Sequence, residues 1–268
     1  MTDSLDNMKQ KIAKLCKQIE KERNIRILFA IENGSRAWRM DSKDSDYDVR
    51  YVYVRPIEDY LQLNQKPDVI TTAFDENLKP HPVQGSLVDM SGFDVFKYAK
   101  LLASSNPTTI EWIISDIVYY GKQNKVFKNF AMKNFNPISL YFHYKSSSRN
   151  NYEKYIKSGN HVTHKKYLYA YRGLVNAKWI VHKGTVPPIV FMEALDGLKK
   201  YIPAQVASEL KKIIKIKSSG KEKDEIQRLP VLDSYAERFL KSDAEAPAKR
   251  ERSSLDALNK EIKKILKI

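Results

Sequence analysis

Two aspartates separated by one residue are the feature of this sequence best suited to catalysis. Asp46 and Asp48 stand at the start of an alternating segment, residues 47–54, which predicts a β-strand. Successive side chains of a strand point to opposite faces, so both carboxylates would lie on one side. Carboxylates held that close repel each other, and a divalent cation between them removes the repulsion. Mg²⁺ suits such a pair, because it combines protein carboxylates with water and substrate phosphates.

A glycine–serine turn precedes this pair and offers a place for phosphate. Gly34 and Ser35 follow an apolar segment, residues 25–31, that predicts a buried strand, and a short helix is expected from Arg36. Glycine lets the backbone approach a phosphate closely, and N–H groups at a helix start face the anion. Ser35 adds a hydroxyl donor and Arg36 a charged fork. A triphosphate turn beside Mg²⁺-binding carboxylates is what nucleotidyl transfer requires.

A third carboxylate would complete a site for two metal ions, roughly 3.5–4 Å apart. Asp89 is the candidate, because it lies in residues 86–90, a predicted strand, between apolar neighbours. Asp94 is the rival. It ends the segment 91–94, which has the spacing of a capping box for a helix to about Ala103, so a structural role is expected for it.

These motifs together resemble a known superfamily. Gly34-Ser35 followed by Asp46-Tyr47-Asp48 is similar to the signature of the DNA polymerase β-like nucleotidyltransferases. The wider strings GSRAW and DSDYDVR resemble a narrower group, the predicted nucleotidyltransferases associated with RNA-repair ligase pathways. Later blocks of that group are similar to segments near residues 87–94, 105–112 and 165–173, so the likeness covers roughly residues 25–195.

The resemblance implies a mixed-sheet catalytic core, two Mg²⁺ ions that Mn²⁺ can replace, a nucleoside triphosphate (NTP) substrate and a helical second part. Position by position, it makes Gly34 and Ser35 the phosphate turn, Asp46 and Asp48 the metal ligands, and Asp89 the third acid. The sequence departs from the group at Arg39, where the residue after Trp38 is expected to be glycine.

Further candidates for nucleotide binding surround these motifs. Ser45, with Ser42, is expected to play a minor part near phosphate. Arg50 shares a face with Asp48, and pairing with the carboxylates and reaching the substrate are equally favoured. Lys165, Tyr169 and Arg172 form one row of a helix predicted over residues 163–183. That row could be a solvated basic face, but we favour a surface that grips triphosphate or an acceptor strand, with tyrosine stacking on a base. The spacing of His143, His161 and His164 fits no zinc pattern.

Composition limits the class of protein. The 268 residues carry a formal net charge of +15, which favours polyanionic partners, although the same charge can serve solubility alone. Cys16 is the single cysteine, which excludes an internal disulfide and a cysteine zinc cluster. The beginning of the chain shows no signal peptide, and no apolar run approaches the ~20 residues of a membrane span. The sequence thus predicts a soluble cytoplasmic protein with no membrane partner.

The elements expected around the site belong to an α/β (α+β) fold. An amphipathic helix at about residues 4–22 precedes the strands, and the signals from residue 125 onward are helical. We therefore expect a mixed-sheet nucleotidyltransferase domain in residues 1–125 and an all-helical substrate-binding domain in residues 126–268, with the active site in the cleft between them.

The predicted activity is Mg²⁺-dependent transfer of a nucleoside monophosphate from an NTP to an acceptor hydroxyl, with release of pyrophosphate. RNA, either tRNA-like or with damaged ends, is the favoured acceptor because of the charge and the resemblance. Two alternatives remain open: nucleotidylation of a protein or a small molecule, and an RNA-binding module without catalysis. The sequence does not decide which NTP is used.

Overall fold

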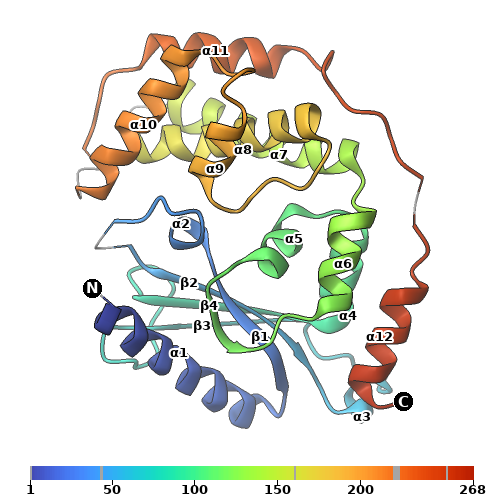
Figure 1. The fold of residues 1–268 in the computed structure, drawn as a ribbon. Helices are drawn as coiled ribbons and strands as arrows, with labels where there is room; N and C mark the ends of the chain where they lie inside the picture. The colour runs from blue at the N-terminus through green and yellow to red at the C-terminus, as the bar shows by residue number, and fades with distance from the viewer. Residues whose placement is uncertain (1, 43–44, 160, 220–223, 252) are drawn as a thin grey trace.

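A five-stranded mixed sheet forms the centre of the N-terminal half (Figure 1). The computed structural model describes residues 2–42, 45–159, 161–219, 224–251 and 253–268, with side chains described from residue 6 onward. Its strand order is β3-β4-β2-β1-β5; β2 and β4 run parallel and the other neighbours antiparallel. The strands are β1 (Arg26–Asn33), β2 (Tyr47–Val54), β3 (Val69–Phe74), β4 (Val88–Asp94) and β5 (Val118–Gly121). The mixed sheet of the predicted fold class is confirmed.

Helices cover both faces of this sheet. On one face, α1 (Thr2–Arg23) buries Ile12, Leu15, Cys16 and Ile19 against the strands. On the other face lie α4 (Val95–Ala103), α5 (Pro107–Ile114) and α6 (Lys125–Asn134). The alternation within β2 assigns its side chains, because Val49, Tyr51 and Tyr53 join the core under α1 while Val52 and Val54 join the opposite core. Asp48 and Arg50 therefore face away from α1, toward the helical half.

The helical half follows as predicted. It consists of α7 (Pro137–Tyr152), which continues as a π-helix (Glu153–Lys157), then α8 (His164–Lys183), α9 (Phe191–Gly197), α10 (Ala204–Ser218) and α11 (Pro230–Lys241). The expected limits of α8 are confirmed, since Thr163 caps its start by accepting a hydrogen bond from the Lys166 N–H, and Gly184 ends it with φ +64°. None of the helices in the described ranges is both long and apolar enough to cross a membrane.

The boundary between β4 and α4 differs from the prediction. Residues 91–94 do not begin the helix, because 91–93 pair with both β2 and β3 and extend the strand. Gly92 lies flat against a tyrosine ring of β2: a Cβ there would be 2.0 Å from Tyr51. Asp94 is the N-cap, and its carboxylate accepts a hydrogen bond of 2.9 Å from the Phe96 N–H. The structural role expected for Asp94 is thus confirmed, but Asp94 is the N-cap itself rather than the last residue of a capping box.

Three short elements lie between the longer ones. The α9 helix begins at Phe191, after the pair Pro187-Pro188. A four-residue strand, β5, pairs with β1. A one-turn helix, α3 (Ile57–Tyr60), follows β2.

The C-terminal helix returns to the sheet-containing half. The chain runs from α11 along the side of the molecule to α12 (Asp256–Leu266), which packs against α4 and α6 (Figure 1). Arg26 donates a hydrogen bond of 2.8 Å to the Ile265 carbonyl, and the Asn124 amide donates one of 2.7 Å to Glu261. One hydrophobic core extends across both halves, so the division into 1–125 and 126–268 stays a prediction.

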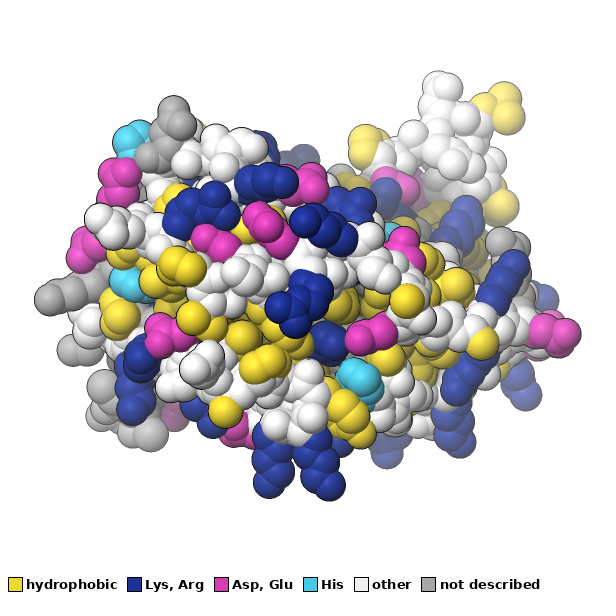
Figure 2. Space-filling view, turned by 90° about the horizontal axis from the view of Figure 1, so that it is seen from above, with side chains coloured by type: hydrophobic (Ala, Val, Ile, Leu, Met, Phe, Trp, Pro, Cys, Tyr) yellow, Lys and Arg dark blue, Asp and Glu magenta, His cyan; other side chains and the backbone are white. Residues whose placement is uncertain are grey.

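Basic side chains are dispersed over the helical half. Figure 2 shows Lys and Arg interspersed with acidic and hydrophobic side chains rather than gathered into one block. Several of these lysines have acidic partners, as in Lys211–Asp196 at 2.7 Å and Lys178–Glu245 at 3.0 Å. On this face the net charge alone does not identify a binding site.

Candidate active site

Asp48 and Asp89 lie directly opposite each other on neighbouring parallel strands. They are register partners in the β2–β4 pairing, and both side chains lie on the face of the sheet opposite the core under α1. Asp46 is exposed just before β2, two residues from Asp48. Burial raises the pKa of Asp48 to about 6; Arg50 opposes this rise, and the charges of Asp46 and Asp89 add to it. The three predicted acids are therefore electrostatically coupled.

The glycine–serine turn packs against one of these carboxylates. It forms the first turn of α2 (Gly34–Ala37), directly after β1, and Asn33 is the register partner of Asp48. Gly34 has φ +69°, and a Cβ there would lie 1.9 Å from Oδ2 of Asp48. Both the conformation and the space thus require glycine. Ser35 is buried, with 5% of its surface exposed.

Arg36 and Ser45 hold the segment that leads into Asp46. The Arg36 guanidinium donates a hydrogen bond of 3.0 Å to the carbonyl of Asp46 and another to the carbonyl of Ser45, and it stacks on the ring of Tyr47 at 4.0 Å. The Ser45 hydroxyl accepts a hydrogen bond of 2.9 Å from the Ser42 N–H. The phosphate contacts predicted for Arg36 and Ser45 stay predictions, and both side chains already have protein partners.

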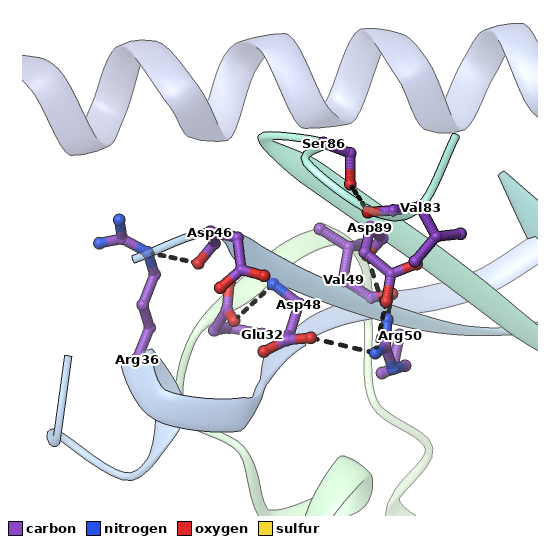
Figure 3. Close-up of polar contacts among 9 residues, drawn as sticks. All are labelled: Glu32, Arg36, Asp46, Asp48, Val49, Arg50, Val83, Ser86 and Asp89. Atoms are coloured by element: carbon purple, nitrogen blue, oxygen red, sulfur yellow. Dashed lines mark hydrogen bonds and ion pairs between the residues drawn. The ribbon is translucent and has the colours of Figure 1, made fainter. Parts of the chain in front are cut away.

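Arg50 pairs with the carboxylates, which was one of its two predicted roles. Its Nη2 atom donates to Oδ1 of Asp48 at 3.1 Å and to Oδ2 of Asp89 at 2.8 Å. Its Nη1 atom donates to the carbonyls of Val49 and Asp89 at 3.0 and 3.1 Å. Figure 3 shows the guanidinium between the two strands, beside both acids.

Glu32 is a buried acid beside the site that the sequence-based prediction missed. Its Oε1 atom accepts a hydrogen bond of 3.0 Å from the Asp48 N–H, and its Oε2 atom accepts one of 2.5 Å from the Tyr119 hydroxyl. Burial raises the pKa of Glu32 to about 8; the Tyr119 hydrogen bond opposes that rise and the charge of Asp48 adds to it. A charged residue at the end of an otherwise apolar strand was the signal that could have indicated it.

The predicted row on α8 lies above this site, but its members have different surroundings. The Lys165 ammonium lies 5.9 Å from the centroid of the Tyr169 ring, and its charge makes a small contribution that lowers the pKa of Asp48. Tyr169 meets the ring of Trp38 edge to face, with centroids 5.7 Å apart. Arg172 stacks on the same indole at 3.6 Å and forms an ion pair with Glu111. Tyr169 and Arg172 thus join α2 to α8, and Lys165 lies beside Tyr169.

A buried polar cluster supports this junction. Glu111, on α5, accepts a hydrogen bond of 2.8 Å from the Tyr144 hydroxyl and one of 3.3 Å from the Trp38 indole, besides pairing with Arg172. The carbonyl of Trp38 also accepts a hydrogen bond of 3.1 Å from the Phe191 N–H. Trp38, the C-cap of α2, is therefore held by three other elements, α5, α8 and α9.

Arg39, the departure from the expected pattern, adopts the conformation that glycine favours. Its φ is +54°, in the left-handed region. The side chain reaches Asp116 at 2.7 Å and the Arg36 carbonyl at 2.9 Å. The loop thus keeps a glycine-like bend without glycine.

The donors present suit a hard divalent cation, although they are not gathered as a complete ligand set. Within the described part of the chain, no three His, Cys, Asp or Glu side chains are grouped so as to hold a metal ion together. Asp46 and Asp48 offer carboxylate oxygens on one face, which are the donors that Mg²⁺ prefers. The mutual repulsion that helps to raise the pKa of Asp48 is also what such a cation would relieve.

This sheet, with its aspartates on adjoining strands beside a glycine turn, defines a polymerase β-like nucleotidyltransferase, an enzyme class. A family model described as "RNA repair pathway DNA polymerase beta family", RlaP, matches residues 8–264, and the chain belongs to that family. The predicted resemblance is confirmed, and the match extends beyond residues 25–195 at both ends.

Two further comparisons found similar proteins. The chain is 33% identical over 261 residues to "Uncharacterized protein YcgL" of Bacillus subtilis (strain 168), covering 97% of this chain and 95% of that protein. It is also similar to a crystal structure of a nucleotidyltransferase-like protein from Exiguobacterium sibiricum 255-15, at 12% identity and a TM-score of 0.30. That match covers 86% of this chain and 74% of the other.

Proposed function

We propose that this enzyme transfers a nucleoside monophosphate from an NTP to a hydroxyl group of RNA, with Mg²⁺ held by Asp46 and Asp48. The observation that carries the proposal is the alignment of Asp48 with Asp89 across the parallel strands, with Gly34 packed against the Asp48 carboxylate. Carboxylates and a glycine turn at one point serve both the cation and the triphosphate. Bound Mg²⁺, or Mn²⁺ in its place, would neutralise negative charge on the triphosphate.

The protein's own groups position the substrate. The backbone at Gly34-Ser35 receives phosphate oxygens, and Lys165, in the first turn of α8, adds a positive charge that lowers the pKa of Asp48. Arg36 fixes the segment before Asp46 through its hydrogen bonds to two carbonyls. These contacts hold the triphosphate and the acids in one geometry before the reaction begins.

The reaction then exchanges one phosphorus–oxygen bond for another. The acceptor oxygen forms a bond to the α-phosphorus, and the bond from that phosphorus to the bridging oxygen of pyrophosphate breaks. The hydroxyl proton leaves toward the Asp89 carboxylate, which faces the same side of the sheet as Asp48. Pyrophosphate departs with the electron pair of the broken bond.

RNA is the proposed acceptor, because the family is described by an RNA repair pathway and the net charge of +15 favours a polyanion. An RNA substrate also implies action in the cytoplasm. Nucleotidylation of a protein or small molecule would use the same acids, so the acceptor must be identified by experiment.

The test is incubation of the folded protein with each of four labelled NTPs, Mg²⁺ and either tRNA-like or nicked RNA. We expect label in RNA with wild type and none with Asp46→Ala, while both bind RNA with similar salt sensitivity. RNA binding without transfer by either protein, from any NTP, would favour the non-catalytic module. Label in added protein or small molecules, but not in RNA, would change the acceptor and keep the enzyme class.

A further inference from the structure

The guanidinium of Arg50 lies between the carboxylates of Asp48 and Asp89 and supplies the positive charge that both contact. One nitrogen, Nη2 of Arg50, donates to Oδ1 of Asp48 and to Oδ2 of Asp89, at 3.1 and 2.8 Å. A metal ion that linked these two acids would need the same carboxylate oxygens, at about 2.0–2.1 Å for Mg²⁺. The guanidinium therefore stands where a second ion would stand.

The surroundings of Arg50 hold it in this position. Its other terminal nitrogen donates to the carbonyls of Val49 and Asp89, so the guanidinium makes four hydrogen bonds to two strands. Its side chain is only 17% exposed, and those of Asp48 and Asp89 are 25% and 18% exposed. A charge-assisted network at this depth is expensive to break, because each lost partner leaves a poorly solvated charge.

As a result, the three aspartates differ in how many of their oxygens are already hydrogen-bonded to the protein. Asp46 is exposed, and no described side chain forms an ion pair with it, whereas Asp89 has its Oδ2 and its backbone carbonyl bound to Arg50. Asp48 has Oδ1 toward Arg50 and Oδ2 beside Gly34. The oxygens open to a divalent ion thus lie on the side of Asp46 and the glycine turn, not between Asp48 and Asp89.

We infer that Arg50 takes the place of the second divalent ion, so that this enzyme binds a single ion, with the triphosphate, at Asp46 and Asp48. The inference rests on the proposed function, and it replaces the two ions that the family resemblance implies. Asp89 then acts as a carboxylate oriented by Arg50. Arg50 is a positioning residue, since it acts on the substrate through these two acids.

The experiment counts Mn²⁺ ions with a non-hydrolysable NTP analogue and uses their electron paramagnetic resonance. Two ions roughly 3.5–4 Å apart would be magnetically coupled, whereas a single ion gives an uncoupled signal. We expect one uncoupled Mn²⁺ per chain in the wild type. Arg50→Met, which keeps the length and loses the charge, is expected to bind a second Mn²⁺ and to show the coupled signal. Arg50→Lys, which keeps a cation, should stay at one ion.

A matched control is Arg55→Met, beyond the far end of the same strand, where Arg55 donates to the Pro67 carbonyl at 2.8 Å. It should bind one ion like the wild type, and circular dichroism should show all four proteins folded. A coupled pair in the wild type, or one ion in Arg50→Met, overturns the inference while leaving metal-dependent transfer intact. No Mn²⁺ bound by wild type with the analogue would overturn the metal-dependent function itself.

Discussion

The carboxylate of Asp48 is the most confined group of the site. Gly34 touches one of its oxygens, Arg50 the other, and Glu32 accepts the hydrogen bond of its backbone N–H. Its direction is therefore set by three residues from two strands and a turn. A ligand fixed in this way needs little rearrangement when the substrate binds, which is how an enzyme stabilises a transition state by preorganisation.

Replacing Gly34 with alanine is expected to remove metal-dependent activity. The left-handed φ costs an alanine about 1–2 kcal/mol, and its Cβ would displace the Asp48 carboxylate. Gly184→Ala is the matched control, because Gly184 has φ +64° but a Cβ there meets nothing within 4 Å. In chemical denaturation, the strained backbone should lower the free energy of unfolding of both variants by a similar amount. Any further loss in Gly34→Ala would come from the clash with Asp48. Mn²⁺ binding should fail in Gly34→Ala alone, and equal Mn²⁺ affinity in both would contradict the proposed contact.

The raised pKa of Glu32 should make the stability of the metal-free protein depend on pH. Its pKa is raised from an ordinary value of 4.5 to about 8, so the folded state binds this proton more tightly than the unfolded state does. Its contribution to stability is present below pH 4.5 and is lost as the pH rises to about 8. Glu32→Gln does not titrate, so the wild type should lose stability relative to this variant across that window. Urea denaturation of both proteins at pH 5 and pH 8.5, in the presence of a chelator, measures their difference in free energy of unfolding. The same difference at both pH values would refute the prediction.

At the scale of secondary structure, contacts between α2 and α8 join the glycine–serine turn to the helical half. Trp38 is the C-cap of α2, and its indole lies against Tyr169 and Arg172 of α8 and donates a hydrogen bond to Glu111 of α5. The turn at Gly34-Ser35 and the lysine at the start of α8 are thus placed by one buried cluster.

Breaking the ion pair in this cluster should be strongly destabilising. Glu111 and Arg172 have side chains 8% and 14% exposed, and removing one partner of such a pair costs about 3–5 kcal/mol. We expect Arg172→Met or Glu111→Gln to lose stability on that scale, and the double variant to lose less than the sum. Urea denaturation of all four proteins gives the coupling energy. Additive losses would show that the pair is not coupled.

Local patterns in the sequence predicted most of the longer elements and singled out three of the acids, because alternation, caps and glycine turns act within a few residues. Asp89 was placed correctly on a strand from its apolar neighbours alone. The sequence left the role of Arg50 open, since its contact with Asp89 depends on the register of two strands that are far apart in the chain. Arg36, Tyr169 and Arg172 were assigned to the substrate, and their protein partners arise from tertiary packing that no local pattern contains.

Over the whole molecule, the C-terminal helix ties the helical half to the sheet. α12 buries Leu258 and Ile262 against the half that contains the sheet, after a segment whose start is anchored by the buried Lys145 at the Ser242 carbonyl and Asp243. The relation between the two halves therefore depends on residues that lie far from the site in sequence.

Leu258→Ala should lower the stability of the entire chain. Loss of a buried leucine side chain costs about 2–5 kcal/mol, and Leu255, at 47% exposed, provides a control expected to change stability by less than about 0.5 kcal/mol. Thermal unfolding of both variants tests this. Equal melting temperatures would mean that α12 does not stabilise the fold.

The measurement that tests the central claim most directly is a crystal structure with Mn²⁺ and a non-hydrolysable NTP, using the anomalous signal of manganese. The account predicts a manganese peak within bonding distance of both Asp46 and Asp48, with the triphosphate against the backbone of Gly34-Ser35 and the α-phosphorus on the side of Asp89. A nucleotide bound elsewhere, or manganese that touches neither aspartate, would contradict it.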